Sequence, residues 1–392
     1  MCVAQRIKKL MIIPVTVFAA GLFFVGISAR AETLEKNDLS LKIDALGKTY
    51  EFFYPEIDKS GGSYYLKNCE EVVDGIFLDT VTRATAARVT VDPEKSNPFT
   101  YFREKDGVGI DKEKLVLMIE DGLNRGVKEI CAPTALIKPT VTVADLKKET
   151  VFRAAFSTGY KNSSAERKQN IALAAKYLCG TRVPPQCEFS FNKAVGERSA
   201  ERGFSSAKII ENGKFTDGVG GGVCQVSSTV YNAALLAGLP VTERRAHSLA
   251  VGYVEPSFDA MVSTGYSDLK FLNDTGRGIY VVAAATDSKI TVRIYGEKPT
   301  ATYRRVSEIT GEIKPEESEV ISADGLFVGE EEWKIFPKNG LTSVGYLEKY
   351  VGGKRVSVKK LSSDKYAPVR GVLLKGVLPR PHEDGESSPP EQ

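Results

Sequence analysis

The stretch DGVGGGVCQVSSTVY, residues 217–231, is the most informative part of this 392-residue chain. Its glycine run ends at Gly222, and apolar residues then recur at steps of three and four up to a helix stop at Gly238 and Pro240. We therefore expect a helix that begins directly after a glycine loop, with Cys224 in its first turn. Free backbone N–H groups and the positive end of the helix dipole lie at that point, and both lower the pKa of a thiol and favour the thiolate.

A base for this thiol is available at one position. The chain has 2 histidines, and His382 lies in a polar tail, so His247 is the credible partner if Cys224 needs an imidazole to accept its proton. The glycines would also let a substrate approach the backbone closely and let N–H groups face a developing oxyanion. The alternative is a buried structural cysteine at the start of a well-packed helix.

In sites of this kind a third side chain orients the imidazole. Asp259, Asp268 and Asn273 lie downstream of His247 and could each do so, although Asp and Asn more commonly serve turns and caps. We select Asp268 and Asn273 as the orienting candidates. The surrounding pattern predicts three strands, which are Leu249 to Val254 and a hairpin of Ile279 to Ala284 with Lys289 to Tyr295.

Several sequence blocks resemble the VanW domain. They are GGGVCQVSSTVYNAA at 220–234, FSFN at 189–192 with VGER at 195–198, Glu243-Arg244 before His247-Ser248, and DLKFLN at 268–273. They follow the family's order across about residues 150–297, which makes the resemblance specific. It departs from the pattern at Pro185-Gln186-Cys187-Glu188, where the family usually reads Pro-Gly-Glu, so the local turn there is in doubt. Members are associated with the bacterial cell wall, and the name comes from a glycopeptide-resistance cluster.

The resemblance implies a cysteine-dependent L,D-transpeptidase that cross-links peptidoglycan stem peptides, or a carboxypeptidase if water replaces the acceptor amine. Cys224 and His247 would be catalytic, and Arg198 and Arg244 would bind stem carboxylates. The full set of expected substrate-binding residues is Gly221, Gly222, Gln225, Ser227, Asn192, Arg198 and Arg244. The alternative is a non-catalytic peptidoglycan-binding or glycopeptide-resistance accessory protein with a structural Cys224. We expect no cofactor, and no metal because the chain has one usable histidine and no Cys-x-x-Cys pair.

The N-terminus predicts export. Arg6, Lys8 and Lys9 precede an apolar run from Leu10 to Ile27, and Ala29-Arg30-Ala31 resembles a cleavage site. The run is also long enough to remain as a membrane anchor. We therefore expect a protein of the cell wall or of the outer face of the membrane. A net charge of +3 without a long basic run argues against nucleic acid as a partner.

The cysteine count fits an exported protein with one free thiol. With Cys2 set aside, pairing Cys69 with Cys131 and Cys179 with Cys187 would leave Cys224 unpaired. The alternative is that these cysteines are reduced and merely buried.

The fold class we expect is α+β, in a multi-domain exported protein with a mixed helix and strand core and a β-rich C-terminal extension. The expected segments are a signal or anchor at 1–31, an α+β domain at 32–145, the VanW domain at 150–297, a β-rich extension at 298–376 and a disordered tail at 377–392. The first domain, with a helix from Asp111 to Arg125, resembles the peptidoglycan-binding domain that often precedes VanW domains; a scaffold without a ligand is the alternative. The extension would adhere to wall polymer or simply pack on the core.

Overall fold

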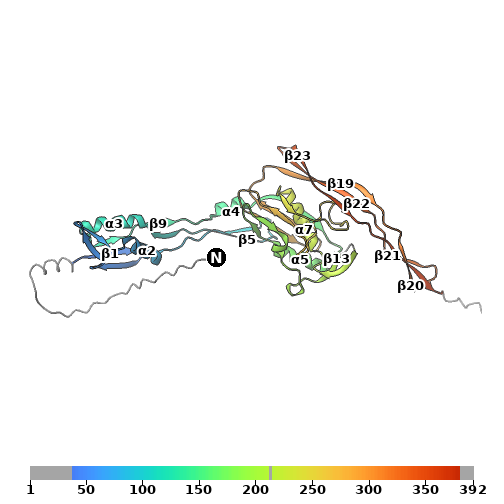
Figure 1. Cartoon of the computed structure of the whole chain (residues 1–392), viewed down its shortest axis with the longest axis horizontal. Coiled ribbons are helices and arrows are strands. Elements are labelled where there is room, and N and C mark those ends of the chain that lie inside the picture. Colours follow the sequence, from blue (N-terminus) through green and yellow to red (C-terminus); the bar gives the residue numbers. More distant parts are fainter. Residues whose placement is uncertain (1–37, 212–213, 380–392) are drawn as a thin grey trace, which may run out of the picture. The chain divides into compact units, whose positions relative to one another are not determined.

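The computed structural model describes residues 38–211 and 214–379, which form two compact units (Figure 1). One unit takes the described chain up to Thr85 together with Lys105–Lys138, and the other takes Ala86–Glu104 together with the chain from Pro139 onward. The expected signal or anchor lies outside the described residues, as does the expected tail beyond residue 379. Within the described ranges, no helix is long and apolar enough to cross a membrane.

The first unit is an α+β arrangement built around one apolar core. Its elements are β1 (Ser40–Ala45), β2 (Lys48–Phe53), β3 (Ile57–Ser60), β4 (Ser63–Leu66), α2 (Cys69–Thr80), β7 (Gly107–Ile110), α3 (Lys112–Asn124), β8 (Glu129–Cys131) and β9 (Thr134–Ile137). Leu115 and Ile119 of α3 pack in this core with Ile43 of β1. Asp111 caps α3 by accepting a hydrogen bond from the Lys114 N–H at 3.2 Å, which confirms the helix expected there.

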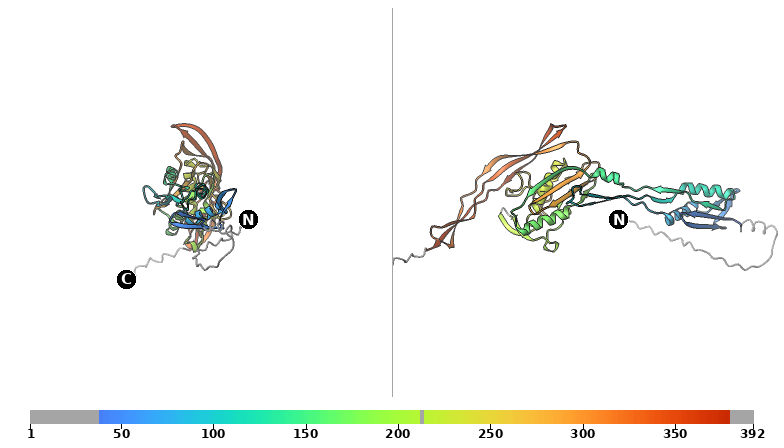
Figure 2. Two further views of the ribbon diagram at one scale, coloured as in Figure 1. Left: turned by 90° about the vertical axis from the view of Figure 1, so that its left-hand side faces the viewer. Right: turned by 180° about the vertical axis from the view of Figure 1, so that it is seen from behind.

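The second unit is centred on an antiparallel sheet in the order β10 (Val151–Gly159), β18 (Lys289–Gly296), β17 (Ile279–Ala285), β11 (Thr181–Val183). Strands β17 and β18 pair in antiparallel fashion, which confirms the hairpin expected from Ile279 to Ala284 and Lys289 to Tyr295. Helices α5 (Ala165–Leu178) and α7 (Val223–Leu236) pack against this sheet (Figure 2).

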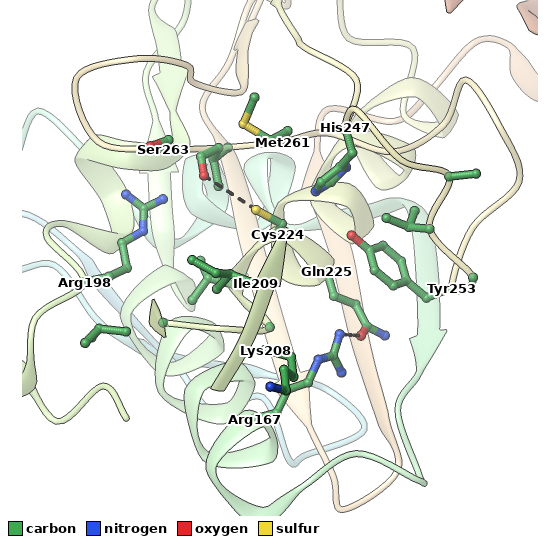
Figure 3. A pocket seen from close by; sticks show the side chains of 18 of the residues that line it. Arg167, Arg198, Lys208, Ile209, Cys224, Gln225, His247, Tyr253, Met261 and Ser263 are labelled. Carbon is green, nitrogen blue, oxygen red and sulfur yellow. Dashed lines mark hydrogen bonds between the residues drawn. The ribbon is translucent and has the colours of Figure 1, made fainter. Parts of the chain in front are cut away.

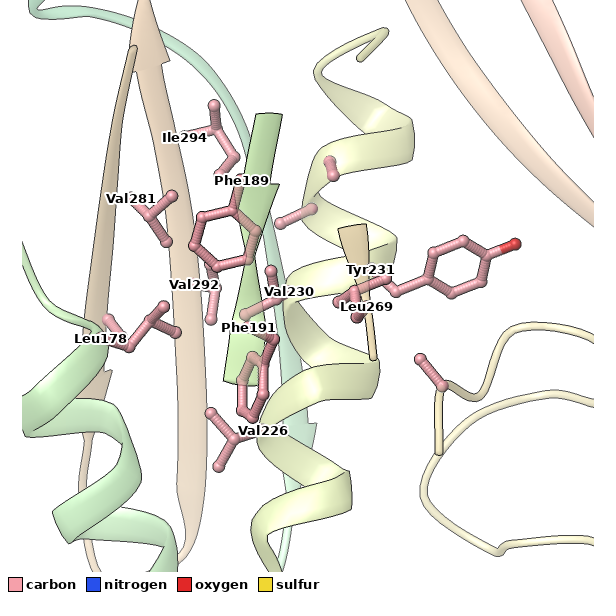
Figure 4. Close-up of a cluster of buried hydrophobic side chains, with 14 of the residues drawn as sticks. Leu178, Phe189, Phe191, Val226, Val230, Tyr231, Leu269, Val281, Val292 and Ile294 are labelled. Carbon is pink, nitrogen blue, oxygen red and sulfur yellow. The ribbon is translucent and has the colours of Figure 1, made fainter. Parts of the chain in front are cut away.

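Side chains alternate between the two faces of the sheet, as the pleat of a strand requires. Val281 and Ile294 point into the larger core, which they share with Val230 of α7 (Figure 4). Tyr280 and Val282 belong to a separate cluster with Phe99 and Tyr295. This second face is covered by the pair β5 (Arg88–Val91) and β6 (Phe99–Phe102), and α4 (Val143–Glu149) leads into β10.

Helix α7 is buried along nearly its whole length, so the strand and loop segments around it fix the position of its first turn. The glycines before it are needed for distinct reasons. Gly220 and Gly222 have φ values of 85° and 106°, which favour glycine, and Gly222 is the N-cap. A Cβ on Gly221 would lie 2.7 Å from the Ala207 carbonyl in β13. The helix expected after the glycine loop, with Cys224 in its first turn, is confirmed.

Short elements complete the core. They are β12 (Glu188–Ser190), α6 (Phe191–Val195), the 3₁₀ turn Ala200–Arg202, β13 (Ser206–Glu211), β14 (Lys214–Val219), β15 (Val241–Glu243) and β16 (Lys270–Leu272). The strand expected at Leu249 to Val254 is wrong, because that segment is irregular and pairs with no strand. Leu249 is buried, which accounts for part of the apolar pattern of this segment.

The C-terminal part is β-rich, as expected. One antiparallel sheet has the order β19 (Thr302–Ile313), β22 (Gly340–Val351), β23 (Lys354–Tyr366). A second, mixed sheet has the order β20 (Glu319–Phe327), β24 (Val372–Leu378), β21 (Glu331–Ile335), in which β20 and β24 are parallel. β24 therefore extends two residues into the expected tail. Residues 298–379 belong to the same compact unit as the core, and Tyr366 at the end of β23 is fully buried. The expected α+β class with a β-rich C-terminal part is confirmed.

Candidate active site around Cys224

A cleft of about 610 Å³ opens at the N-terminus of α7 (Figure 3). Its walls come from the glycine loop, from β13, and from two irregular segments at 250–253 and 261–264. Lys338, from the C-terminal extension, also lines it. Both Cys224 and His247 face this cleft, so the structure brings together the two residues that the sequence selected for chemistry.

Cys224 is half-buried in the first turn of α7. Its thiol donates to the Val262 carbonyl oxygen, with a sulfur–oxygen distance of 3.5 Å. In the same turn, the Val223 and Gln225 N–H groups donate to the carbonyls of Gly220 and Gly222, and no backbone carbonyl of the described chain accepts from the Cys224 N–H. That N–H group and the helix dipole are therefore available to a negative charge beside the sulfur.

The imidazole of His247 lies between the thiol and a buried carboxylate. Its Nδ1 is 2.6 Å from Asp259 Oδ2, and the His247 backbone N–H donates to the same oxygen at 2.7 Å. The ring also interacts with Cys224, and this interaction lowers the pKa of the thiol and raises the pKa of His247. Because Nδ1 faces the carboxylate, Nδ1 carries a proton and Nε2 is directed to the sulfur. Cys224, His247 and Asp259 thus form a series in which each group interacts with the next.

The pKa shifts in this series favour charge separation. Burial alone would raise the pKa of the Cys224 thiol, but the hydrogen bond and positive charge of His247 lower it below its ordinary value. Burial would likewise lower the pKa of His247, but hydrogen bonds to Asp259 and Cys224 raise it to about 9. Both shifts act in the direction of a thiolate paired with an imidazolium.

The carboxylate of Asp259 accepts four hydrogen bonds and is fully buried. Besides the two from His247, its Oδ1 accepts from Tyr366 OH at 2.6 Å and from Arg244 Nη2 at 2.9 Å. Burial would raise the pKa of Asp259, but the His247 bond and the Arg244 charge lower it to about 2. Asp259 therefore remains ionised at neutral pH and is held in one orientation.

Among the described residues that line the cleft, four are cationic and none carries a carboxylate. Its cationic residues are Arg167, Arg198, Lys208 and Lys338. Arg198 donates to Thr264 Oγ1 at 3.1 Å and to Asn192 Oδ1 at 2.6 Å, and Arg167 donates to Ser163 Oγ and Gln225 Oε1, each at 2.7 Å. Neither guanidinium has an ion pair with a carboxylate in the described chain. Lys208, in contrast, pairs with Asp217. The electrostatics of the cleft favour an anionic ligand.

The structure places the expected substrate-binding residues at different depths. Gly222, Gln225 and Arg198 line the cleft. Asn192 does not line it but accepts a hydrogen bond from Arg198, which it orients. Gln225 is buried, and its amide donates to Thr158 Oγ1 and the Gly159 carbonyl, so its chief contacts are internal.

Gly221, Ser227 and Arg244 do not line the cleft. Ser227 lies one turn further along α7, where its hydroxyl donates to the Ala260 carbonyl at 2.6 Å. The Arg244 side chain is only 7% exposed, and its donors are taken by Asp259 and by Asp364, whose Oδ1 is 2.7 Å from Nη1. The structure therefore corrects the assignment of Arg244 as a carboxylate clamp, because all three of its nitrogens donate to Asp259 or Asp364 and it does not line the cleft.

Neither orienting candidate chosen from the sequence contacts His247 in the structure. Asp268 accepts from Ser190 Oγ and from the Asn192 N–H at 2.9 Å, and so caps the start of α6. Asn273 is fully buried and holds the turn around Gln186, whose φ of 57° occupies a left-handed position that a glycine usually fills. Asp259, which the sequence placed beside these two, takes the orienting position instead.

Neither expected disulfide is formed in the structure. Cys69, Cys131, Cys179, Cys187 and Cys224 are all free. Cys179 packs against the cluster that contains Phe99 and Tyr280, whereas Cys187 is exposed in the turn held by Asn273, so the two thiols have different surroundings. The described part of the chain holds no group of three or more His, Cys, Asp or Glu suited to a metal ion.

An α+β core that presents a Cys-His-Asp series at a helix N-terminus defines the class of site as one suited to thiol-based acyl transfer. Residues 166–295 match the family model described as VanW like protein. This segment of the chain is therefore similar to the VanW family, and the cleft lies within and beside it.

Two curated relatives share this region. The first is an uncharacterized protein, YoaR, of Bacillus subtilis (strain 168), which is 40% identical over 140 residues, or 36% of this chain and 46% of the relative. The second is the Vancomycin B-type resistance protein VanW of Enterococcus faecalis (strain ATCC 700802 / V583), which is 31% identical over 156 residues, or 38% of this chain and 56% of the relative. The chain thus spans about half the length of the curated relatives it matches.

Two solved structures of G5 domains show a local likeness. The IgA1 protease G5 domain is 26% identical, covers 21% of this chain and 94% of its own, and has a TM-score of 0.15. The HP0197 G5 domain is 25% identical, covers 20% of this chain and 96% of its own, and has a TM-score of 0.12. At such TM-scores the likeness carries no functional conclusion for this chain.

Proposed function

We propose that this protein remodels peptidoglycan outside the cytoplasm through a covalent intermediate on Cys224. The observation that carries this proposal is the meeting of Cys224, His247 and Asp259 beside a cleft whose described lining has four cations and no carboxylate. The export signal expected in the N-terminal sequence supports an extracytoplasmic location. The VanW domain, which is also present in a relative named for vancomycin resistance, supports a role connected with the cell wall.

The first step would be acylation of the thiol. The Cys224 thiolate attacks the carbonyl carbon between the third and fourth residues of a stem peptide and forms a carbon–sulfur bond. The resulting oxyanion would face the Cys224 N–H and the positive end of α7. His247, already an imidazolium, then donates its proton to the amide nitrogen as the carbon–nitrogen bond breaks. The D-amino acid leaves as an amine, and the stem remains as a thioester.

The second step would regenerate the thiolate. The amine of another stem attacks the thioester carbonyl, neutral His247 accepts its proton, and the carbon–sulfur bond breaks to release a cross-linked peptide. Water in place of the amine would release a carboxylic acid, and the overall reaction would then be that of a carboxypeptidase. Both outcomes need the same three side chains and no cofactor, so the acceptor alone decides between transpeptidase and carboxypeptidase.

Recognition of the stem would depend on the cations of the cleft. Arg198 is largely buried, its pKa is lowered by that burial, and its bonds to Asn192 and Thr264 fix its position. A carboxylate of the stem would give it the anionic partner that the protein does not provide. Arg167 and Lys338 line the same cleft and would favour the same charge. These contacts would place the scissile carbonyl beside the sulfur.

Intact-mass analysis of the full chain after incubation with purified muropeptides tests the proposal. We expect a mass increase equal to the acyl part of the stem, located on Cys224 by peptide mapping, and its loss in Cys224→Ala. Cross-linked or trimmed muropeptides in wild type but not in Cys224→Ala would identify the reaction. Binding of muropeptides by both proteins without an adduct or product would instead support the non-catalytic wall-binding protein.

A further inference from the structure

The site extends beyond the VanW match into the last strand of the neighbouring sheet. β23 ends with Asp364 and Tyr366, which are two residues apart and therefore on the same face of the strand. Asp364 Oδ1 lies 2.7 Å from Arg244 Nη1, and Tyr366 OH lies 2.6 Å from Asp259 Oδ1. Both contacts reach the buried carboxylate that holds His247, one directly and one through Arg244.

These contacts connect positions that are far apart in sequence. Asp364 is 120 residues from Arg244, and Tyr366 is 107 residues from Asp259. The hydroxyl of Tyr366 also accepts from the Ser257 N–H at 2.8 Å, which fixes the direction of its donated proton toward Asp259. The Asp364 side chain is 10% exposed, so water competes little for its bond to Arg244.

We propose that Asp364, in the C-terminal sheet, is a positioning residue of the thiol site, which acts through Arg244 on Asp259 and His247. Arg244 forms ion pairs with both Asp259 and Asp364. The negative charge of Asp364 therefore offsets part of the positive charge that Arg244 exerts on Asp259. Without the Asp364 charge, Arg244 would draw more strongly on Asp259, and the imidazolium would lose part of its stabilisation. The inference rests on the proposed chemistry of Cys224 but can be tested without any peptidoglycan substrate.

The charged and titratable groups around the His247 imidazole come from several elements, and the test must change none of them except the one under study. They are Cys224 and Tyr231 of α7, Arg244 and Asp259 of the segments flanking His247, Tyr253 of the cleft wall, Arg167 of α5, Arg198 of the loop after α6, and Asp364 and Tyr366 of β23. Asp364 can lose its charge without removing a direct partner of His247, Cys224 or Asp259, because its ion pair is with Arg244. Asp364→Asn is therefore the informative change.

The test is the rate of alkylation of Cys224 by iodoacetamide as a function of pH, followed by peptide mapping of the full chain. The exposed Cys131 in the same sample gives an internal reference for reagent and pH. In wild type, the profile should show two inflections, one for formation of the thiolate and one for loss of the imidazolium proton near the His247 pKa of about 9. In Asp364→Asn the upper inflection should move down by about one pH unit.

Glu348→Gln provides the matched control. Glu348 lies in the same sheet, is 4% exposed, and is paired with Arg304 and Arg355 on strands β19 and β23, but it does not contact Asp259 or Arg244. Its profile should superimpose on that of wild type. Asp364→Glu, which keeps the charge, should restore much of the wild-type profile.

A wild-type profile in folded Asp364→Asn would overturn the inference, as would an equal shift in Glu348→Gln. Circular dichroism of each variant establishes whether it is folded. If Asp364→Asn does not fold, Asp364→Ser takes its place, because it also removes the charge, and a wild-type profile in that folded variant would count against the role. These outcomes are independent of whether muropeptides acylate Cys224.

Discussion

Replacing Asp259 by asparagine should remove the imidazolium from the site at neutral pH. His247 has a pKa of about 9 against an ordinary value of 6.5, and hydrogen bonds to Asp259 and Cys224 hold it there against burial. The difference of about 2.5 pKa units corresponds to about 3.4 kcal/mol, or a factor of about 300 in the population of the imidazolium. An asparagine keeps the shape of Asp259 but supplies no negative charge, so we expect the pKa of His247 to fall to its ordinary value or below.

The consequence for the thiol follows from the same hydrogen bond. With a neutral imidazole beside it, Cys224 loses the positive charge that lowers its pKa, and burial then opposes the thiolate. Because Cys224 supplies part of the His247 shift, the factor of 300 is a ceiling. We expect alkylation of Cys224 at pH 7 to slow on the order of 10- to 100-fold in Asp259→Asn, with the profile displaced to higher pH.

Asp268→Asn is the natural comparison, because the sequence favoured Asp268 for this role. Asp268 caps α6 and does not contact His247, so its variant should lose some thermal stability but keep the wild-type alkylation profile. Peptide mapping of alkylated Cys224 across pH 5 to 10 would measure the alkylation profiles of both variants. An unchanged profile in a folded Asp259→Asn protein, or the same displacement in Asp268→Asn, would refute the assignment of Asp259 as the partner of His247.

Three further outcomes can be measured separately. His247→Ala should lower muropeptide turnover on the order of 100- to 10,000-fold without abolishing acylation, because the helix dipole still favours the thiolate; product analysis by mass spectrometry would show this. Arg198→Gln should raise KM for a carboxylate-bearing peptide, and an unchanged KM would exclude the carboxylate contact. Gly221→Ala should lower the free energy of unfolding by about 1–3 kcal/mol, because the added Cβ would lie 2.7 Å from the backbone of β13. Gly252→Ala should not, because a Cβ there has no atom within 4 Å, and denaturant titration would compare the two variants.

The parts of the fold that were predictable from sequence depend on local patterns. The apolar spacing after Gly222 defines α7, and the Asp111 cap defines the start of α3, because each signal lies within a few residues of the feature it specifies. The segment from Leu249 to Val254 carries a similar apolar pattern but forms no strand, since no neighbouring strand pairs with it. A local pattern indicates burial there without indicating the backbone conformation.

The choice among Asp259, Asp268 and Asn273 could not be made from the sequence, because all three are short polar residues downstream of His247. Long-range contacts separate them. Asp259 is selected by its contacts with Arg244 and Tyr366, whereas the other two are occupied with capping α6 and holding a turn. The wrong expectation for Arg244 has the same cause. Its ion pair with Asp364 is a contact between residues 120 positions apart, which no local pattern reveals.

The contact between β23 and the buried Asp259 also limits how this polypeptide can be divided and when it can become reactive. A fragment that stops at the end of the family match, at residue 295, would leave Asp259 and Arg244 without two of their partners. Synthesis proceeds from the N-terminus, so Cys224 is made about 140 residues before Tyr366, and the thiol site cannot be completed until β23 has been added. The nascent chain therefore contains Cys224 without its complete surroundings while these residues are added, and the contacts of Asp259 are completed only late in synthesis.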